Sequence, residues 1–260
     1  MQFTTDPPAG WPNPRRSAAR ILSAVFLAVI TGVIALVAVA SATTGDYLEA
    51  IGFGLAAVLV AHVTAIGVIS LWRPRPAAGG PATGVTDQGE RGLAFAYARL
   101  PYYLLAVTVA VVIVLAAGFA VLMATDGTGG ALAVVGAVTA GFLGWFLVVL
   151  MRLAPGTLVV TPSGIYHRSL VLEHFVPWDA VVDVLAREGT DPWITVKALP
   201  IDGTRQRRHT GRLHAFEGQA LPFLVARSSW LRANTVPAYQ AVKYYYDHPE
   251  QRAELAKSRE

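Results

Sequence analysis

The sequence predicts a membrane α-helical bundle of four transmembrane helices, followed by a cytoplasmic α+β domain, a β-barrel or sandwich with a C-terminal helix. Three observations support this fold class. Only 15% of the 260 residues are charged, whereas soluble domains carry about 25%. Four long runs are almost free of ionisable side chains. Beyond residue 153 the pattern changes to short alternating segments separated by turns.

The four apolar runs are long enough to cross a bilayer. They are residues 21–42, 51–72, 101–124 and 130–151, and His62 is their one ionisable side chain. At about 1.5 Å per residue they give roughly 33 to 36 Å of helix, enough for a hydrocarbon core of about 30 Å. Because lipid offers no hydrogen bonds to the backbone, each run is expected to be helical.

The distribution of basic residues predicts the orientation. Arg15, Arg16 and Arg20 precede the first run, four Lys or Arg lie between the second and third, and the rest follow the fourth. The connections between runs one and two and between runs three and four have none. The positive-inside rule therefore predicts a multi-pass protein of the inner (plasma) membrane with both termini cytoplasmic.

The first apolar run has an alternative interpretation as a cleavable export signal. Arg15 and Arg16 precede it, and the small residues of 40–42 could form a cleavage site. The run is longer than a signal-peptide core of about 7 to 15 residues, which favours a retained helix. Cleavage would leave three spans and the same cytoplasmic C-terminus.

Composition divides the chain into three domains. Residues 1–17 are expected to be a disordered lead, residues 18–153 a transmembrane domain, and residues 154–260 a cytoplasmic domain that folds alone. Within the transmembrane domain, residues 73–100 are rich in Pro and Gly and are expected to be a flexible linker. The segment 93–103, which overlaps the end of this linker, is amphipathic, and we expect its tyrosines to act as anchors at the membrane interface.

The segment after residue 153 is expected to form six or seven strands. Strands are predicted at 157–160, 165–169, 172–178, 181–185 and 193–198, with one or two more in 207–216. A hairpin centred on residues 170 and 171 would place Arg168 opposite Glu173 and Tyr166 opposite Phe175, an ion pair and an aromatic pair. A helix is expected from about Asn234.

The stretch "LVVTPSGIYHRSLVLEHFVPWDAVVDV" resembles the start of the bacterial PH-like (pleckstrin-homology-like) domains attached to actinobacterial multi-pass membrane proteins. The shared features are a T-P-x-G-I turn and the segment Val176-Pro177-Trp178-Asp179-Ala180-Val181. The tail "YYYDHPEQRAEL" is similar to the ends of such proteins. The resemblance covers roughly residues 157–255 and implies a fold and a compartment, but no activity.

Small residues recur every four positions in the apolar runs, as in Gly136, Ala140 and Gly144. Such stripes allow helix backbones to approach closely. A compact bundle within one chain explains them, and a homo-oligomer through these small-residue helix faces is the alternative.

Three groups of residues are candidate sites. His62 lies in the middle of a span, where an ionisable side chain suggests function; a hydrogen bond to a neighbouring helix is the simpler explanation. His167 and His174 face one another in the expected hairpin, but without a third ligand they make a weak metal site, and no metal or cofactor is expected. Arg205, Arg207, Arg208 and Arg212 would lie near a hairpin tip, where they could contact anionic lipid or a protein partner.

No catalytic motif is found in the sequence, and the absence of cysteine excludes thiol chemistry and disulfides. No nucleic-acid-binding motif accompanies the net charge of +4. We therefore expect a non-enzymatic membrane protein that presents a PH-like module to membrane lipids or to a protein partner, as a scaffold, regulatory or accessory subunit. The alternative is a small transporter or channel subunit that works around His62.

Overall fold

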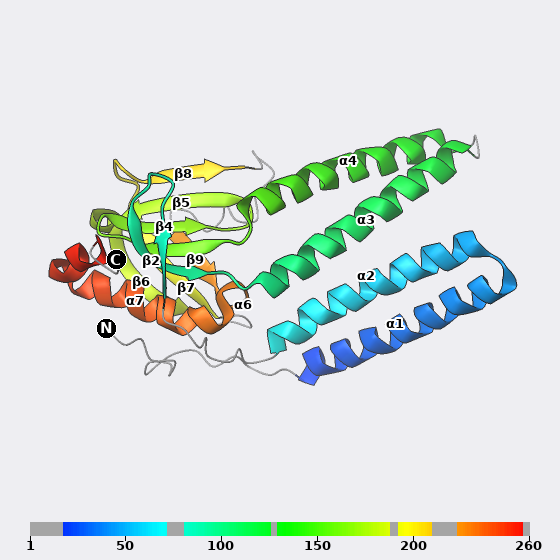
Figure 1. The fold of residues 1–260 in the computed structure, drawn as a ribbon, viewed down its shortest axis with the longest axis horizontal. Coiled ribbons are helices and arrows are strands. Elements are labelled where there is room, and N and C mark those ends of the chain that lie inside the picture. The colour runs from blue at the N-terminus through cyan, green and yellow to red at the C-terminus, as the bar shows by residue number, and fades with distance from the viewer. Residues whose placement is uncertain (1–17, 72–80, 126–128, 188–191, 210–222, 257–260) are drawn as a thin grey trace. The chain divides into compact units, whose positions relative to one another are not determined.

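The computed structural model describes residues 18–71, 81–125, 129–187, 192–209 and 223–256. They form two compact units. A membrane unit contains the four long helices, and a β unit contains residues 81–99 and 153–256. Figure 1 labels the elements of both. The predicted disordered lead, residues 1–17, lies outside the described residues.

Four helices are long and apolar enough to cross a membrane, which confirms the predicted spans. They are α1 (Ala18–Thr44), α2 (Tyr47–Leu71), α3 (Arg99–Thr125) and α4 (Gly130–Leu153). Helices α1 and α2 pack as an antiparallel hairpin joined through Gly45 and Asp46. Gly45 has a φ of 91°, a conformation that glycine adopts without steric cost.

Helix α4 approaches α3 closely at one member of the small-residue stripe. A Cβ atom on Gly136 would lie 2.9 Å from the carbonyl oxygen of Ala116 and 3.0 Å from the Cβ of Ala120. A larger side chain at this position would push the two helices apart. At Gly136, therefore, the stripe serves packing within one chain.

The segment expected to be a flexible linker contains two β-strands, so that prediction was wrong. These strands are β1 (Ala82–Val85) and β2 (Arg91–Ala96). Strand β2 pairs with β3 (Thr157–Val160), with Leu93 opposite Val160 and Ala96 opposite Thr157. The composition was misleading because two glycines permit close strand contacts: a Cβ on Gly92 would collide with the Val160 carbonyl, and one on Gly84 with the Ala94 side chain.

The α3–α4 hairpin is consequently an insertion between two neighbouring strands of one sheet. Strand β2 precedes α3, and strand β3 follows α4. A segment that begins at residue 154 lacks β1 and β2, so β3 loses β2, one of its two partner strands. The expectation that residues 154–260 are a self-contained domain is therefore also corrected: the described β unit needs both parts of the chain.

The larger sheet has six antiparallel strands in the order β1-β2-β3-β4-β5-β8. Its remaining strands are β4 (Gly164–Arg168), β5 (Leu172–Pro177) and β8 (Arg205–Arg208). The predicted hairpin register is confirmed, since Arg168 pairs with Glu173 and Tyr166 with Phe175. Both faces of the central strands are buried. One face carries Phe95, Leu158, Val160, Ile165 and Val176, and the other carries the cluster of Val159, Tyr166 and Phe175.

A second sheet has the order β6-β7-β9, with β6 (Val181–Arg187), β7 (Trp193–Ala198) and β9 (Phe223–Arg227). A short 3-10 helix, η1 (Trp178–Ala180), connects the two sheets along the chain. The second sheet buries Val184, Ile194, Val196, Leu224 and Ala226 on one face. Strand β9 was not predicted as such, but the described residues after 153 contain seven strands, β3 to β9, within the predicted six or seven. With β1 and β2, which precede α3, the described residues contain nine strands.

The C-terminal part is helical, as expected. It consists of α6 (Ser228–Leu231), η3 (Arg232–Asn234), α7 (Thr235–Asp247) and η4 (Pro249–Ala256). Helix α7 lies against β6 (Figure 1), and the Tyr246 hydroxyl donates a hydrogen bond of 2.6 Å to the Val182 carbonyl. The buried face of α7 carries Ala238, Ala241, Val242 and Tyr245, at the spacing of one helix face.

Candidate functional site

The predicted arginine segment forms a strand in place of a hairpin tip. Arg205, Arg207 and Arg208 belong to β8, which pairs with β5 and lies at the edge of the larger sheet. In this register Arg205 lies opposite Phe175 and Arg207 opposite Glu173. Arg212 lies outside the described residues.

The three described arginines differ in their surroundings. Arg205 is held by Asp87, with 3.1 Å between Nη2 and Oδ1, and its guanidinium lies 4.3 Å from the centre of the Phe175 ring. Arg207 and Arg208 are exposed. Arg205 therefore stabilises the sheet, whereas Arg207 and Arg208 are available for contact with an anion.

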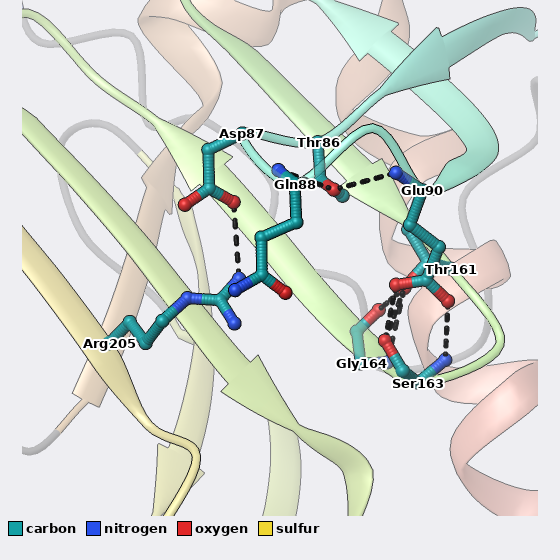
Figure 2. Close-up of polar contacts among 8 residues, drawn as sticks. All are labelled: Thr86, Asp87, Gln88, Glu90, Thr161, Ser163, Gly164 and Arg205. Atoms are coloured by element: carbon teal, nitrogen blue, oxygen red, sulfur yellow. Dashed lines mark hydrogen bonds and ion pairs between the residues drawn. The ribbon is translucent and has the colours of Figure 1, made fainter.

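The turn between β1 and β2 is fixed to the turn between β3 and β4 by Glu90 (Figure 2). Its carboxylate accepts the backbone N–H of Ser163 at 3.1 Å, the Thr161 hydroxyl at 3.1 Å, and the Ser163 hydroxyl. Thr86 orders the first turn, because its hydroxyl accepts the backbone N–H groups of Gln88 and Glu90. Asp87 of the same turn reaches Arg205. The turn between β1 and β2 thus contacts both the turn between β3 and β4 and the edge strand β8.

His167 and His174 are directly opposite one another, as predicted, and both are buried. Burial, with a smaller contribution from His174, lowers the pKa of His167 to about 3. Burial also lowers the pKa of His174 to about 4. Both imidazoles are therefore neutral at physiological pH.

Tyr97 is the hydrogen-bond partner of His167, with 2.5 Å between the hydroxyl oxygen and Nε2. The Tyr97 ring also stacks on Trp230, with centroids 6.3 Å apart. Its neighbours are held as well: the Ala98 N–H donates to the Trp230 carbonyl at 2.8 Å, and the Asn234 side chain donates to the Ala96 carbonyl at 2.8 Å. The expectation that Tyr97 anchors the chain at the membrane interface was wrong, because this tyrosine is a core residue of the β unit.

His62 forms its hydrogen bond within its own helix. Its Nδ1 lies 2.8 Å from the Val58 carbonyl, one turn earlier in α2. The ring is 6.2 Å from that of Tyr103 on α3. The expected bond to a neighbouring helix is thus replaced by a local one. Thr31, Thr108 and Thr139, which lie in the other three spans, likewise donate to carbonyls of their own helices.

Among the described residues, no cluster of three or more His, Asp or Glu side chains could hold a metal ion. The opposed His167 and His174 lack a third ligand of these types in that part of the chain. The exposed guanidinium groups of Arg207 and Arg208 can bind phosphate or carboxylate oxygens.

Sequence reasoning missed Asp87, Glu90 and Tyr97. A signal was present for the first two, because "TDQGE" lies between two short runs that contain apolar residues and includes Gly89, which has a φ of 81°. Such a turn between short runs indicates a hairpin. Nothing in the local sequence connects Tyr97 to His167, since the two residues are 70 positions apart.

The comparisons with known proteins found no matching family model, no matching curated protein and no matching solved structure.

Proposed function

We propose that this chain is a non-enzymatic integral membrane protein whose β unit is a PH-like module, presented at the cytoplasmic face to bind anionic phospholipid. The PH-like assignment is supported by two antiparallel sheets and a C-terminal helix packed against them. The α3–α4 hairpin, inserted between β2 and β3, is an addition to the PH-like arrangement of two sheets and a C-terminal helix.

The cytoplasmic location is supported by the basic residues and by the sheet itself. Strands β1 and β2 pair within the same sheet as strands that follow α4, so the chain before α3 and the chain after α4 lie on one side of the bilayer. A helical hairpin satisfies this condition because it returns the chain to the side from which it entered. The excess of Lys and Arg on these segments makes that side cytoplasmic.

The observation that carries the proposed lipid contact is the exposure of Arg207 and Arg208 on edge strand β8, next to Arg205, which Asp87 already holds. Exposed arginines near an anionic leaflet gain about 1 kcal/mol each. The connections between the β unit and the membrane helices are short: two residues separate β2 from α3, and three separate α4 from β3. Such segments span at most about 10 Å, which raises the effective concentration of the module at the bilayer.

Thermal unfolding of the full-length protein tests this proposal. The protein is placed in nanodiscs of phosphatidylcholine with and without phosphatidylglycerol, and the midpoint of β-unit unfolding is measured. Anionic lipid is expected to raise the midpoint through preferential binding to the folded state, and the double variant Arg207→Ser/Arg208→Ser is expected to lose this increase. The variant Arg91→Ser/Lys243→Ser, with the same change in net charge, is the control and should retain it.

Equal midpoints of the wild-type protein in the two lipids would contradict the lipid contact. If a protein purified with the chain from native membranes raised the midpoint where lipid did not, the module would bind a protein partner. For the transporter alternative, the local bond of His62 to Val58 is an observation that favours a structural histidine.

A further inference from the structure

The strand registers of the larger sheet align five residues in one row: Ala96, Thr157, Arg168, Glu173 and Arg207. Ala96 is the last residue of β2, and Thr157 is the first residue of β3. The chain therefore enters α3 and returns from α4 at this end of the sheet. Arg168 lies on β4, beside β3, whereas Arg207 lies on the edge strand β8, two strands beyond β4.

The second sheet contributes a row to the same end. Arg187, Trp193 and Arg227 are aligned across β6, β7 and β9. Strand β9 continues directly into α6, whose Trp230 accepts the Ala98 N–H at 2.8 Å and stacks on Tyr97. Because Ala98 is the last residue before α3, this second row also lies at the end where the membrane helices leave the β unit.

Five arginines from four strands thus lie at one end of the β unit. We call this surface the arginine end; its members are Arg168, Arg187, Arg207, Arg208 and Arg227. All but Arg168 are exposed. Arg168 donates one N–H to the Pro155 carbonyl at 3.2 Å, and its Nε is buried without a hydrogen-bond partner among the described residues.

Among the described residues, one acidic side chain lies in these two rows. Within the described part of the chain, Glu173 is the carboxylate in the row, and it is already engaged by Tyr166 and by His209, whose Nε2 lies 3.3 Å away. Glu188 and Asp191 belong to the connection between β6 and β7 and lie outside the described residues.

The opposite end of the β unit is rich in carboxylates. It carries the Glu90 turn, whose contacts with Thr161 and Ser163 place it at the far ends of β2, β3 and β4. Further acidic residues lie in the connections and strand starts at that end: Asp87, Asp179, Asp183 and Asp202. Cations at the same end offset these carboxylates: Lys197 pairs with Asp183, Arg205 pairs with Asp87, and Arg91 follows the Glu90 turn. Among the described residues, the excess of positive side chains therefore lies at the arginine end.

From this arrangement we propose that the arginine end is the docking surface of the module for anionic phospholipid headgroups. The inference rests on the proposed lipid contact and enlarges it from one strand, β8, to a surface built from both sheets. Guanidinium groups match phosphate oxygens in geometry and charge, and this is the end of the sheet from which the chain passes into α3 and to which it returns from α4.

Single-cysteine labelling of the full-length protein tests the proposal, because the chain contains no cysteine of its own. Leu170→Cys places a fluorophore in the turn between β4 and β5, beside Arg168, and Asp202→Cys places it in the connection before β8, at the opposite end. Each labelled protein is reconstituted in nanodiscs that contain a lipid with a spin-labelled headgroup, with and without phosphatidylglycerol. We expect headgroup quenching at residue 170 to exceed that at residue 202 by about twofold or more in the anionic nanodiscs, and to decrease when salt is raised.

The decisive variant is Arg187→Ser/Arg227→Ser, since these residues lie outside β8. It is expected to lower the quenching at residue 170 by about twofold, while Arg91→Ser/Lys243→Ser, which makes the same change in charge at other positions, leaves it unchanged. Unaltered circular dichroism and unfolding midpoints in phosphatidylcholine serve to confirm that the variants fold.

The outcomes separate this inference from the proposed function. If Arg207→Ser/Arg208→Ser lowers quenching while Arg187→Ser/Arg227→Ser has no effect, the lipid contact stands but the arginine end is wrong. If the control variant lowers quenching equally, net charge explains the effect, and the docking surface is likewise refuted. If anionic lipid produces no quenching in the wild-type protein, both proposals fail.

Discussion

The carboxylate of Glu90 accepts the backbone N–H of Ser163 at 3.1 Å, although the two residues are 73 positions apart in the chain. Between them lies the entire α3–α4 hairpin. The contact fastens a turn that precedes the hairpin to a turn that follows it. It is the clearest sign that the β unit is assembled from two segments and that a pair of membrane helices is inserted between them.

The Ser163 hydroxyl also donates to the Glu90 carboxylate, and this side-chain bond should appear as a coupling free energy. In a double-mutant cycle with Glu90→Ala and Ser163→Ala, we expect the effects on the free energy of unfolding to differ from additivity by about 0.5 to 3 kcal/mol. Chemical denaturation of the full-length protein in nanodiscs supplies the four values. Glu90→Ala combined with Asp183→Ala, a residue of the second sheet that pairs with Lys197, should be additive. Additivity of the Glu90 and Ser163 pair would show that the two side chains are not bonded.

Gly92 is expected to tolerate no side chain. An added Cβ would collide with the carbonyl of Val160 on the neighbouring strand, so Gly92→Ala must separate β2 from β3. We expect a loss of unfolding free energy of about 2 kcal/mol or more, the range of severe steric and backbone effects. Gly141→Ala, where a Cβ meets open space, is the matched control. An unaffected Gly92→Ala protein would mean that the two strands are not this close.

Arg205 and Arg207 should differ in their effect on stability. Arg205→Ser removes the ion pair with Asp87 and the contact with the Phe175 ring, and should lower the free energy of unfolding by about 1 kcal/mol. Arg207→Ser removes an exposed side chain and should change it by less than about 0.5 kcal/mol. Denaturant midpoints in phosphatidylcholine, without anionic lipid, provide the measurement. Equal effects would contradict the different roles assigned to them.

Acid should destabilise the β unit through its buried histidines. In the folded state the pKa of His167 is about 3 and that of His174 about 4, both below an unfolded value of about 6.5. The unfolded state therefore binds more protons below pH 6.5. The resulting stability is fully present above that pH and decreases as the pH falls toward the folded-state values, by up to about 1.4 kcal/mol per pH unit for each histidine.

Replacement of one histidine should reduce this pH dependence. In His174→Gln the free energy of unfolding is expected to vary with pH about half as steeply between pH 6.5 and 4, because one of two titrating groups is removed. Denaturation series at several pH values give the slope. A slope identical to that of the wild-type protein would show that His174 is protonated to the same extent in both states.

The sequence predicted best those features that depend on local composition or on adjacent strands. The four helices follow from uncharged runs long enough to cross a bilayer, and the pairing of Arg168 with Glu173 follows from a hairpin whose two strands are neighbours in the chain. In both cases, the residues that determine the structure lie close together in the sequence.

Features that depend on distant partners were missed. "ATGV" and "RGLAFA" become strands because β3 supplies hydrogen-bond partners after two membrane helices have intervened. Similarly, Arg205 appeared equivalent to Arg207 until the structure brought Asp87 beside it. The arginine end could not be predicted either, since its members come from strands whose order and register are set by long-range pairing.

Hydrogen exchange of residues 82–96 tests the central claim most directly. The claim is that this segment belongs to the same sheet as the strands that follow α4. Mass spectrometry of the full-length protein in nanodiscs should find that amides of β2, which pairs on both sides, exchange as slowly as those of β3 and β4. Complete exchange of this segment at the rate of an unstructured chain, while β4 and β5 remain protected, would show that it is a linker and would contradict the two-segment β unit.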